Sequence, residues 1–250
     1  PDNNNKNYKN VWPADIHIIG KDILRFHAIY WPAFLMAAKI DLPNKVFGHG
    51  WILSDEKKMS KSLGNILDPI EIINKYGVDQ LRYYLIKEVS LGNDGSISLE
   101  NLKNCINNDL ANNYGNLCQR VFSFVEKNCS NKIPKPKSFQ NVDIKLLKGL
   151  TESVKDLTKL INNQDLNGYI KKIVDFSFEA NKYFNDSKPW SIKQTDPERM
   201  ETILYTIIEQ IKNISILLYP VIPISASKIL DTLNLPLDER NLDNINKNNS

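Results

Sequence analysis

The hydrophobic positions divide the chain into two parts with different periods. Before about residue 66 the apolar residues come in short runs, which predict strands at 16–19 and 46–53 with a helix from Asp22 between them. Pro32 falls inside that helix and should kink it or end it. From residue 68 onwards apolar residues recur every three or four positions, as is typical of amphipathic helices.

The second part predicts a helical bundle. Antiparallel helices joined by loops of moderate length form bundles, and the polar segments 91–98 and 130–141 are such loops. We expect residues 1–14 to be a flexible lead-in and the Asn-rich residues 241–250 to be a disordered tail. The predicted helices are 69–76, 78–89, 99–127, 142–162, 165–186, 197–219 and a short last one from Pro223 to about 233.

Composition restricts the possible functions. The net charge is only +3, so a nucleic-acid site would have to be a local patch. No apolar run is long enough to cross a bilayer, and the polar start has no signal peptide. Cys105, Cys118 and Cys129 form no C-x-x-C pair, so we expect neither a zinc site nor disulfides, and we expect a cytoplasmic protein. Because the chain starts at Pro1, we expect it to be a piece of a longer protein.

A basic loop follows the second predicted strand. Lys58 and Lys61 bracket two residues of it, and Asp68 begins the next helix as a cap, with Pro69 at the first helical position. Ammonium and hydroxyl groups at the carboxyl end of a strand suit a triphosphate. A Lys-x-x-Lys pair by itself is more often a solvated basic loop.

The five residues Lys58-Met59-Ser60-Lys61-Ser62 resemble the KMSKS signature of class I aminoacyl-tRNA synthetases. The resemblance implies that this loop closes over ATP, which Mg²⁺ accompanies. It also implies that Lys61 holds the phosphates as pyrophosphate leaves and that Lys58 assists, because fixed cations stabilise charge on a leaving group.

Residues 20–33 resemble the methionyl-tRNA synthetase family within that class. The resemblance implies that Ile23 and His27 line the pocket for the methionine side chain and that Gly20 and Asp22 face the adenosine. Ile23 and His27 are four apart and share a helix face, and a thioether favours soft apolar contacts. From spacing alone, a core isoleucine, a core histidine and a plain helix cap at Asp22 remain alternatives.

The same resemblance places His49 and the backbone of Ile52 beside the adenine. An acid–base role for His49 stays open, but nothing in its spacing supports one, and adenylate formation needs no enzyme base because the methionine carboxylate is already the nucleophile. Residues 17–20 (His-Ile-Ile-Gly) resemble the HIGH motif of class I synthetases only by accident, because they lie on the wrong strand. The family's insertion that can bind zinc should precede Pro1, so no zinc site is assigned.

Three residues of the helical part form a second candidate site. Asn116 and Arg120 are four apart on one predicted helix, and Trp190 stands at a helix–helix junction. By themselves they suggest a solvated pair and a packing tryptophan. The frames Asn-Leu-x-x-Arg and Lys-Pro-Trp resemble those of the family's CAU-anticodon readers, in which Trp stacks on an unpaired base while Asn and Arg bond base edges.

The resemblance covers residues 10–235 and implies four segments. These are the C-terminal half of a Rossmann-type nucleotide-binding domain (1–66), a stem-contact connector (67–98), an anticodon-binding α-helical bundle (99–240) and the tail. The fold class is α/β plus all-α. Lys75, Arg82 and Lys87 of the connector are candidates for phosphate contacts.

The implied function is ATP-dependent ligation of methionine to tRNA(Met), including the initiator, by the complete protein. We expect a monomer that binds methionine, ATP and tRNA(Met) and does not bind membranes. A non-catalytic tRNA-binding module, or half of a split synthetase, is the alternative. Ile23 and His27 argue against a leucine- or valine-type synthetase.

Overall fold

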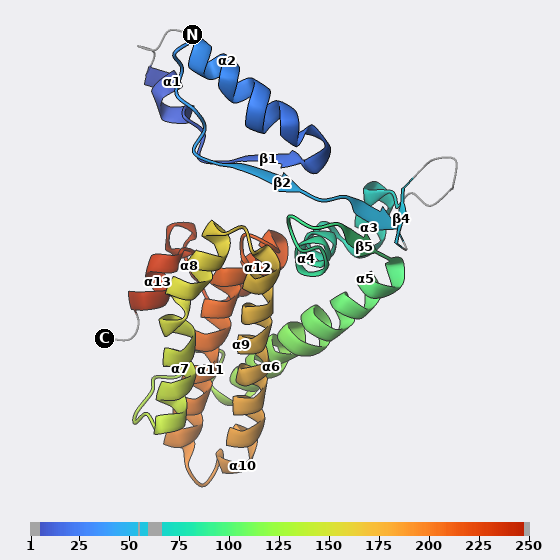
Figure 1. Cartoon of the computed structure of the whole chain (residues 1–250). Coiled ribbons are helices and arrows are strands. Elements are labelled where there is room, and N and C mark those ends of the chain that lie inside the picture. Colours follow the sequence, from blue (N-terminus) through green and yellow to red (C-terminus); the bar gives the residue numbers. More distant parts are fainter. Residues whose placement is uncertain (1–5, 55, 60–66, 248–250) are drawn as a thin grey trace. The chain divides into compact units, whose positions relative to one another are not determined.

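The computed structural model describes residues 6–54, 56–59 and 67–247, and it divides into two compact units (Figure 1). Unit 1 comprises residues 1–67 and 88–97, and unit 2 comprises residues 68–87 and 98–250. In the part of the chain that the structure describes, no helix is long and apolar enough to cross a membrane.

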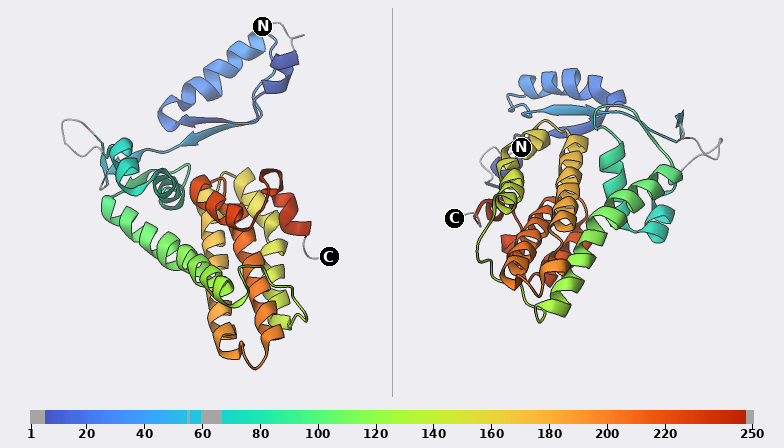
Figure 2. Two further views of the ribbon diagram at one scale, coloured as in Figure 1. Left: turned by 180° about the vertical axis from the view of Figure 1, so that it is seen from behind. Right: turned by 90° about the horizontal axis from the view of Figure 1, so that it is seen from below.

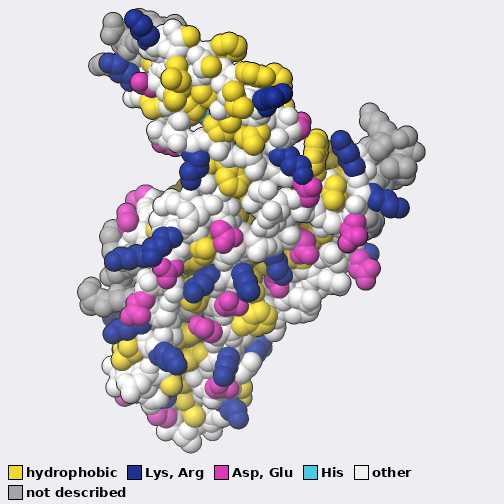
Figure 3. Space-filling model, viewed as in Figure 1, with side chains coloured by type: hydrophobic (Ala, Val, Ile, Leu, Met, Phe, Trp, Pro, Cys, Tyr) yellow, Lys and Arg dark blue, Asp and Glu magenta, His cyan; other side chains and the backbone are white. Residues whose placement is uncertain are grey.

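Unit 1 contains a parallel β-α-β arrangement. Strand β1 (His17–Gly20) pairs with β2 (Val46–His49) in register, with Gly20 opposite His49. Parallel strands need a crossover connection, and here the connection is a helical segment with 3₁₀, π and α geometry in succession. It comprises the 3₁₀ turn η1 (Lys21–Ile23), the π-helix η2 (Phe26–Tyr30) and α2 (Trp31–Ala37). Figure 3 shows hydrophobic side chains gathered over this crossover. Its exposed hydrophobic residues include Phe26, Ile29, Phe34 and Met36.

Two expectations for this unit are corrected. The lead-in contains helix α1 (Lys6–Val11), and the Trp12 indole after it donates to the Asp41 carbonyl at 2.9 Å. Of the two outcomes expected of Pro32, a kink or an end, the second is wrong, because the helix continues to Ala37. Helical backbone continues from the π-helix η2, where the Trp31 N–H donates to the Phe26 carbonyl five residues back, into α2, of which Pro32 is the second residue.

The predicted strand 46–53 is two strands in two different sheets. Gly50 lies between β2 and the next strand, and a Cβ there would come within 2.2 Å of the Asn93 backbone. Strand β3 (Ile52–Ser54) then pairs antiparallel with β4 (Lys57–Lys58) and parallel with β5 (Gly95–Ile97). The segment 91–98, expected to be a loop, therefore supplies a strand.

Unit 2 is helical, and its core is α11, which lies beside α7 and α9 (Figures 1 and 2). Most of α11 is buried because helices surround it. The helices are α3 (Pro69–Tyr76), α4 (Val78–Glu88), α5 (Leu99–Cys105), the π-helix η4 (Ile106–Gly115), α6 (Asn116–Asn128), α7 (Asn141–Glu152), α8 (Val154–Asn162), α9 (Leu166–Ser187), α10 (Pro189–Ile192), α11 (Pro197–Leu218), α12 (Pro223–Thr232), the 3₁₀ turn η5 (Leu237–Glu239) and α13 (Leu242–Lys247).

Local capping explains where several of these helices begin and end. The Asp68 carboxylate accepts from the Ile70 N–H at 2.8 Å, and Gly77, with φ +101°, ends α3. The predicted helix 142–162 is two helices that meet at Ser153. The expected disordered tail contains α13, which is held because Ile245 is 1% exposed.

The connector side chains Arg82 and Lys87 have structural partners in unit 2. Arg82 donates to the carbonyls of Pro220 and Val221, at 2.8 and 2.9 Å. Lys87 forms an ion pair with the buried Asp109, which also accepts from a tyrosine hydroxyl on α4. These contacts satisfy buried polar groups, so they argue against using either cation for RNA phosphates.

Candidate functional site

Unit 1 gathers three of the predicted nucleotide-binding residues in its β-α-β arrangement, and a fourth, Ile52, begins β3 in the other sheet. Gly20 ends β1, His49 lies opposite it at the end of β2, and Asp22 follows in η1. A Cβ at Gly20 would lie 2.5 Å from the Asp22 carboxylate, so a larger residue would displace that side chain. The exposed Ile52 is three residues beyond His49. The carboxyl edge of parallel strands is the usual position for a nucleotide.

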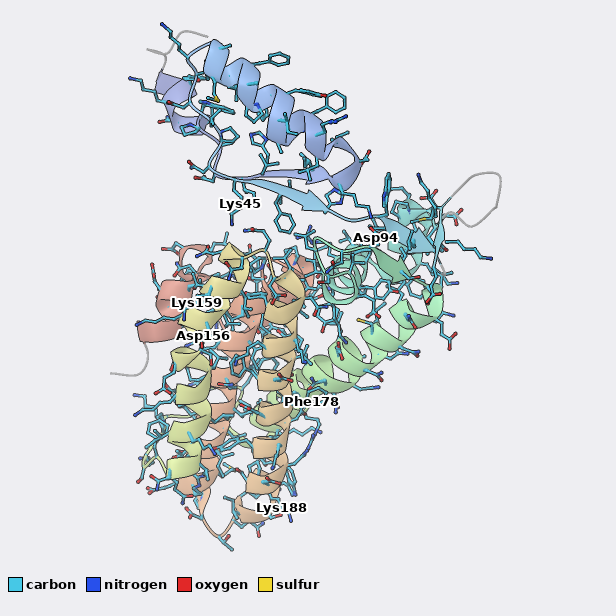
Figure 4. All side chains as sticks on the ribbon, in the orientation of Figure 1. Lys45, Asp94, Asp156, Lys159, Phe178 and Lys188 are labelled. Carbon is cyan, nitrogen blue, oxygen red and sulfur yellow. The ribbon has the colours of Figure 1, made fainter. Side chains whose placement is uncertain are left out.

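An ion pair fixes the loop before β5 to this edge. Lys21 donates to both oxygens of Asp94, at 2.6 and 2.7 Å, and the Trp51 N–H donates to the same carboxylate at 2.7 Å (Figure 4 labels Asp94). The Lys21 ammonium and the Trp51 N–H hold the pKa of Asp94 below its usual range. Sequence reasoning missed Asp94, because a single aspartate in a Gly/Asn/Asp loop carries no local signal of a partner 73 residues away.

Ile23 and His27, the predicted methionine contacts, lie on one side of the crossover helix. His27 Nδ1 is 3.0 Å from the Ile23 carbonyl oxygen. A carbonyl only accepts, so Nδ1 is the donor in this contact. The ring also meets Trp31 edge-on, with centroids 5.9 Å apart, and Trp31 contacts Trp12 and His17 in the same way. This aromatic group fixes the orientation of His27.

The KMSKS residues are only partly described. Lys58 is on β4, opposite Leu53 of β3, and its ammonium lies 4.3 Å from the centroid of the Trp51 ring. Met59 follows it and is half-buried. Ser60, Lys61 and Ser62 lie outside the described residues. The antiparallel pairing of β3 with β4 therefore places the beginning of the signature directly beside the strand that carries Ile52.

Unit 2 brings Arg120 and Trp190 together. The Arg120 guanidinium lies 5.2 Å from the Phe184 ring centroid and 6.0 Å from that of Trp190, and the two rings meet at 75° with centroids 5.6 Å apart. Arg120 Nη2 also donates to Asn185 Oδ1 at 2.7 Å. Phe184 is 2% exposed, whereas Trp190 is 40% exposed.

Asn116 lies one helical turn before Arg120 on α6 and is exposed. Lys188, at the tip of the bundle in Figure 4, adopts φ +42°, and this turn starts α10 with the buried Pro189. The turn presents Trp190 edge-on to Phe184, so the indole is supported from one side. Sequence reasoning missed Phe184 and Asn185, because only the crossing of α6 and α9 reveals them.

A metal site is not apparent in the described ranges. There, no three or more His, Cys, Asp or Glu side chains come together in a way that could hold an ion. Burial raises the pKa of the Cys118 thiol to about 12, which suppresses its reactivity.

Comparison with known families defines the class. Residues 1–122 match the family model described as tRNA synthetases class I (M), and residues 133–248 match the anticodon binding domain of methionyl tRNA ligase. With its β-α-β unit and helical bundle, this chain belongs to the class I aminoacyl-tRNA synthetases. Within the class it belongs to the methionyl-tRNA synthetase family.

Known relatives support this assignment. The chain is 47% identical over 229 residues to a methionine–tRNA ligase of Brucella suis and 45% identical over 239 residues to that of Rickettsia felis. These alignments cover 92% and 94% of this chain but 44% and 46% of the relatives, so the chain spans about half their length. It corresponds to their C-terminal portion.

A solved structure of Mycobacterium tuberculosis methionyl-tRNA synthetase in complex with methionyl-adenylate superposes with a TM-score of 0.95 at 41% identity. The superposition covers 99% of this chain and 49% of that one. The resemblance to this family and the expected α/β plus all-α fold class are thereby confirmed.

Proposed function

We propose that this chain is the C-terminal portion of a methionine–tRNA ligase and that its bundle reads the anticodon of tRNA(Met). The observation that carries the proposal is the half-exposed Trp190, which contacts Phe184 and Arg120. The same chain contains a parallel β-α-β arrangement, whose carboxyl edge is the usual position for a nucleotide. A supported indole with a neighbouring guanidinium suits an unpaired base: one group stacks and the other bonds a base edge.

In the first step, the methionine carboxylate attacks the α-phosphate of ATP, methionyl-adenylate forms and pyrophosphate leaves. Gly20, Asp22, His49 and Ile52 contact the adenosine. Mg²⁺ accompanies the ATP phosphates. Lys58 and Lys61 stabilise the charge that develops on pyrophosphate.

Methionine binds against Ile23 and His27. A thioether has polarizable sulfur and no strong hydrogen-bond donor, so an isoleucine and an oriented imidazole suit it. In the second step, a hydroxyl of the terminal tRNA ribose attacks the adenylate carbonyl and AMP leaves. Anticodon recognition by Asn116, Arg120 and Trp190 selects the tRNA for this step.

The test uses the complete protein. Methionine-dependent exchange of pyrophosphate into ATP measures the first step, and charging of tRNA(Met) measures both. We expect both activities with methionine and neither with leucine or valine. Binding of a CAU stem-loop RNA without any exchange activity would refute the ligase proposal and leave a tRNA-binding module.

A further inference from the structure

Phe178 departs from the burial pattern of its helix. It projects from the middle of α9 and is 55% exposed (Figure 4), whereas the other aromatic residues of α9 are buried. A ring exposed to this extent gains much less of the stabilisation that burial gives those neighbours. The buried ones are Tyr169, Phe176, Tyr183 and Phe184.

Hydrogen bonds place the neighbouring helices beside the face of α9 that carries Phe178. Asn185, seven residues further along, lies on that face and accepts from Arg120 of α6 at 2.7 Å. Asn181, three residues beyond Phe178, donates to Asn113 of η4 through Nδ2 at 2.7 Å. These two bonds fix the crossing of η4 and α6 over α9.

Asn116 lies between Asn113 and Arg120 in the chain, so the two bonds bracket it. Asn116 is exposed, and Arg120 reaches Trp190 at 6.0 Å. Asn116 and Arg120 therefore lie on the helix that crosses α9, and Phe178 lies on the face of α9 that carries the bonds of this crossing.

The charges near Phe178 balance. Lys171 and Lys182 are exposed on its side of α9, and so is Asp175, while the exposed Glu179 is adjacent. Such a surface attracts a phosphate backbone only weakly. Binding here would have to come mainly from a base that stacks on the face of the Phe178 ring, and every base has a π-face that can stack.

We propose that Phe178 is a second stacking platform for an unpaired nucleotide of the RNA loop whose neighbouring base stacks on Trp190. The proposal rests on the anticodon-reading function proposed above. Seven residues of helix separate Phe178 from Asn185, or about 10.5 Å. A different nucleotide of an extended strand would therefore occupy Phe178.

The test measures binding of a CAU stem-loop RNA to the complete protein by fluorescence anisotropy. Phe178→Ala should lower the affinity about tenfold, as expected for loss of one stacked base. Phe178→Tyr should bind like wild type, because it keeps the ring. Phe178→Leu should bind as weakly as the alanine variant, because it keeps apolar area without a π-face. Ile224→Ala, a truncation of a similarly exposed residue on α12, is the matched control and should have no effect.

The parallel variant Trp190→Ala distinguishes two kinds of failure. If it weakens RNA binding and Phe178→Ala does not, the second platform is refuted and anticodon reading stands. If the wild-type protein does not bind the stem-loop, the proposed function itself fails. Phe178→Ala and Phe178→Leu are also compared by melting temperature. If the alanine variant loses both affinity and thermal stability, and the leucine variant has the wild-type value of both, the ring has a packing role and the platform is refuted.

Discussion

Trp190 and Phe184 touch, yet only one of them has an exposed ring. The buried Phe184 contacts the indole and the Arg120 guanidinium, so it positions both groups of the candidate anticodon site. Trp190 keeps a surface on which a base can stack. Truncation of the two residues should therefore have different consequences.

Trp190→Ala should lower the affinity for initiator tRNA roughly tenfold to a hundredfold, because one stacking contact is lost. Pyrophosphate exchange needs no tRNA and should stay near the wild-type value in the complete protein. Both assays and a melting curve are to be run on one preparation. If charging and exchange fall in parallel with the melting temperature, Trp190 is a packing residue and the anticodon assignment is wrong. A tRNA with a changed anticodon is the control, on which wild type and variant should differ little.

Lys61→Ala should slow adenylate formation roughly a hundredfold, because the variant lacks a charge that stabilises departing pyrophosphate. Methionine affinity should change little, since the lysine acts on phosphates. Pyrophosphate exchange at saturating methionine measures the effect. Exchange at the wild-type rate would contradict the proposed role of the KMSKS loop.

His27→Ala should raise the KM for methionine while the KM for ATP stays unchanged. The Nδ1 proton bonds the Ile23 carbonyl, so the ring is held in place for the amino-acid side chain. Initial-rate exchange assays with each substrate varied give the two constants. A change in the ATP constant alone would show that the pocket is wrongly assigned.

At the scale of elements, an ion pair joins three helices of unit 2. Asp143 of α7 accepts from Tyr183 of α9 at 2.6 Å and pairs with Arg199 of α11. Burial alone would raise the pKa of Asp143, but the hydrogen bonds from Arg199, Tyr183 and the Gln140 N–H outweigh it and lower that pKa. A lowered carboxyl pKa stabilises the fold above about pH 4, and this contribution is lost as the pH falls through the folded-state value.

Asp143→Asn should lower the free energy of unfolding by about 3 kcal/mol at pH 7, because it leaves the Arg199 guanidinium without its charge partner. The difference from wild type should shrink below pH 4. Urea unfolding at several pH values measures both. Asp156→Asn breaks the exposed pair with Lys159 that Figure 4 labels, and this control should shift the midpoint little. Equal effects of the two substitutions would contradict the structural role of Asp143.

The predicted elements differ from the observed ones where contacts between residues far apart in the sequence determine the local structure. The Asp68-Pro69 start was predictable from sequence, because a cap acts on N–H groups within three residues. Strand β5 was not, since its partner β3 is about 40 residues earlier and nothing local in the segment marks the pairing. The π-helix η4 keeps an apolar spacing like that of an α-helix, so its wider turn left no sequence signal.

The candidate sites show the same division. Arg120 and Trp190 could be paired from the sequence only through the resemblance, because 69 residues of intervening helix and loop separate them; the structure places the indole beside the guanidinium. Asp94 and Phe184 act through partners on other elements. Neither could be recognised from its own neighbours in sequence.

For the whole molecule, the low net charge predicts that RNA binding depends only moderately on salt. With few phosphate contacts, log K should fall with log salt with a slope of about −2 to −3. Anisotropy titrations with the CAU stem-loop at increasing salt would measure this slope. A slope near −7 would mean that about ten phosphates are neutralised, and it would refute recognition by a few base contacts.

The interleaved order of the two units affects how the gene can be divided. The polypeptide leaves unit 1 after residue 67, returns to it at residue 88 and leaves again after residue 97. A break at residue 67 would separate β3 from β5, and one at residue 98 would separate α4 from the carbonyls that Arg82 bonds. No single break at either junction releases both units intact. Recombination between related genes should therefore preserve residues 52–98 as one inherited block. During synthesis, the ribosome must have reached residue 97 before β3 can pair with β5.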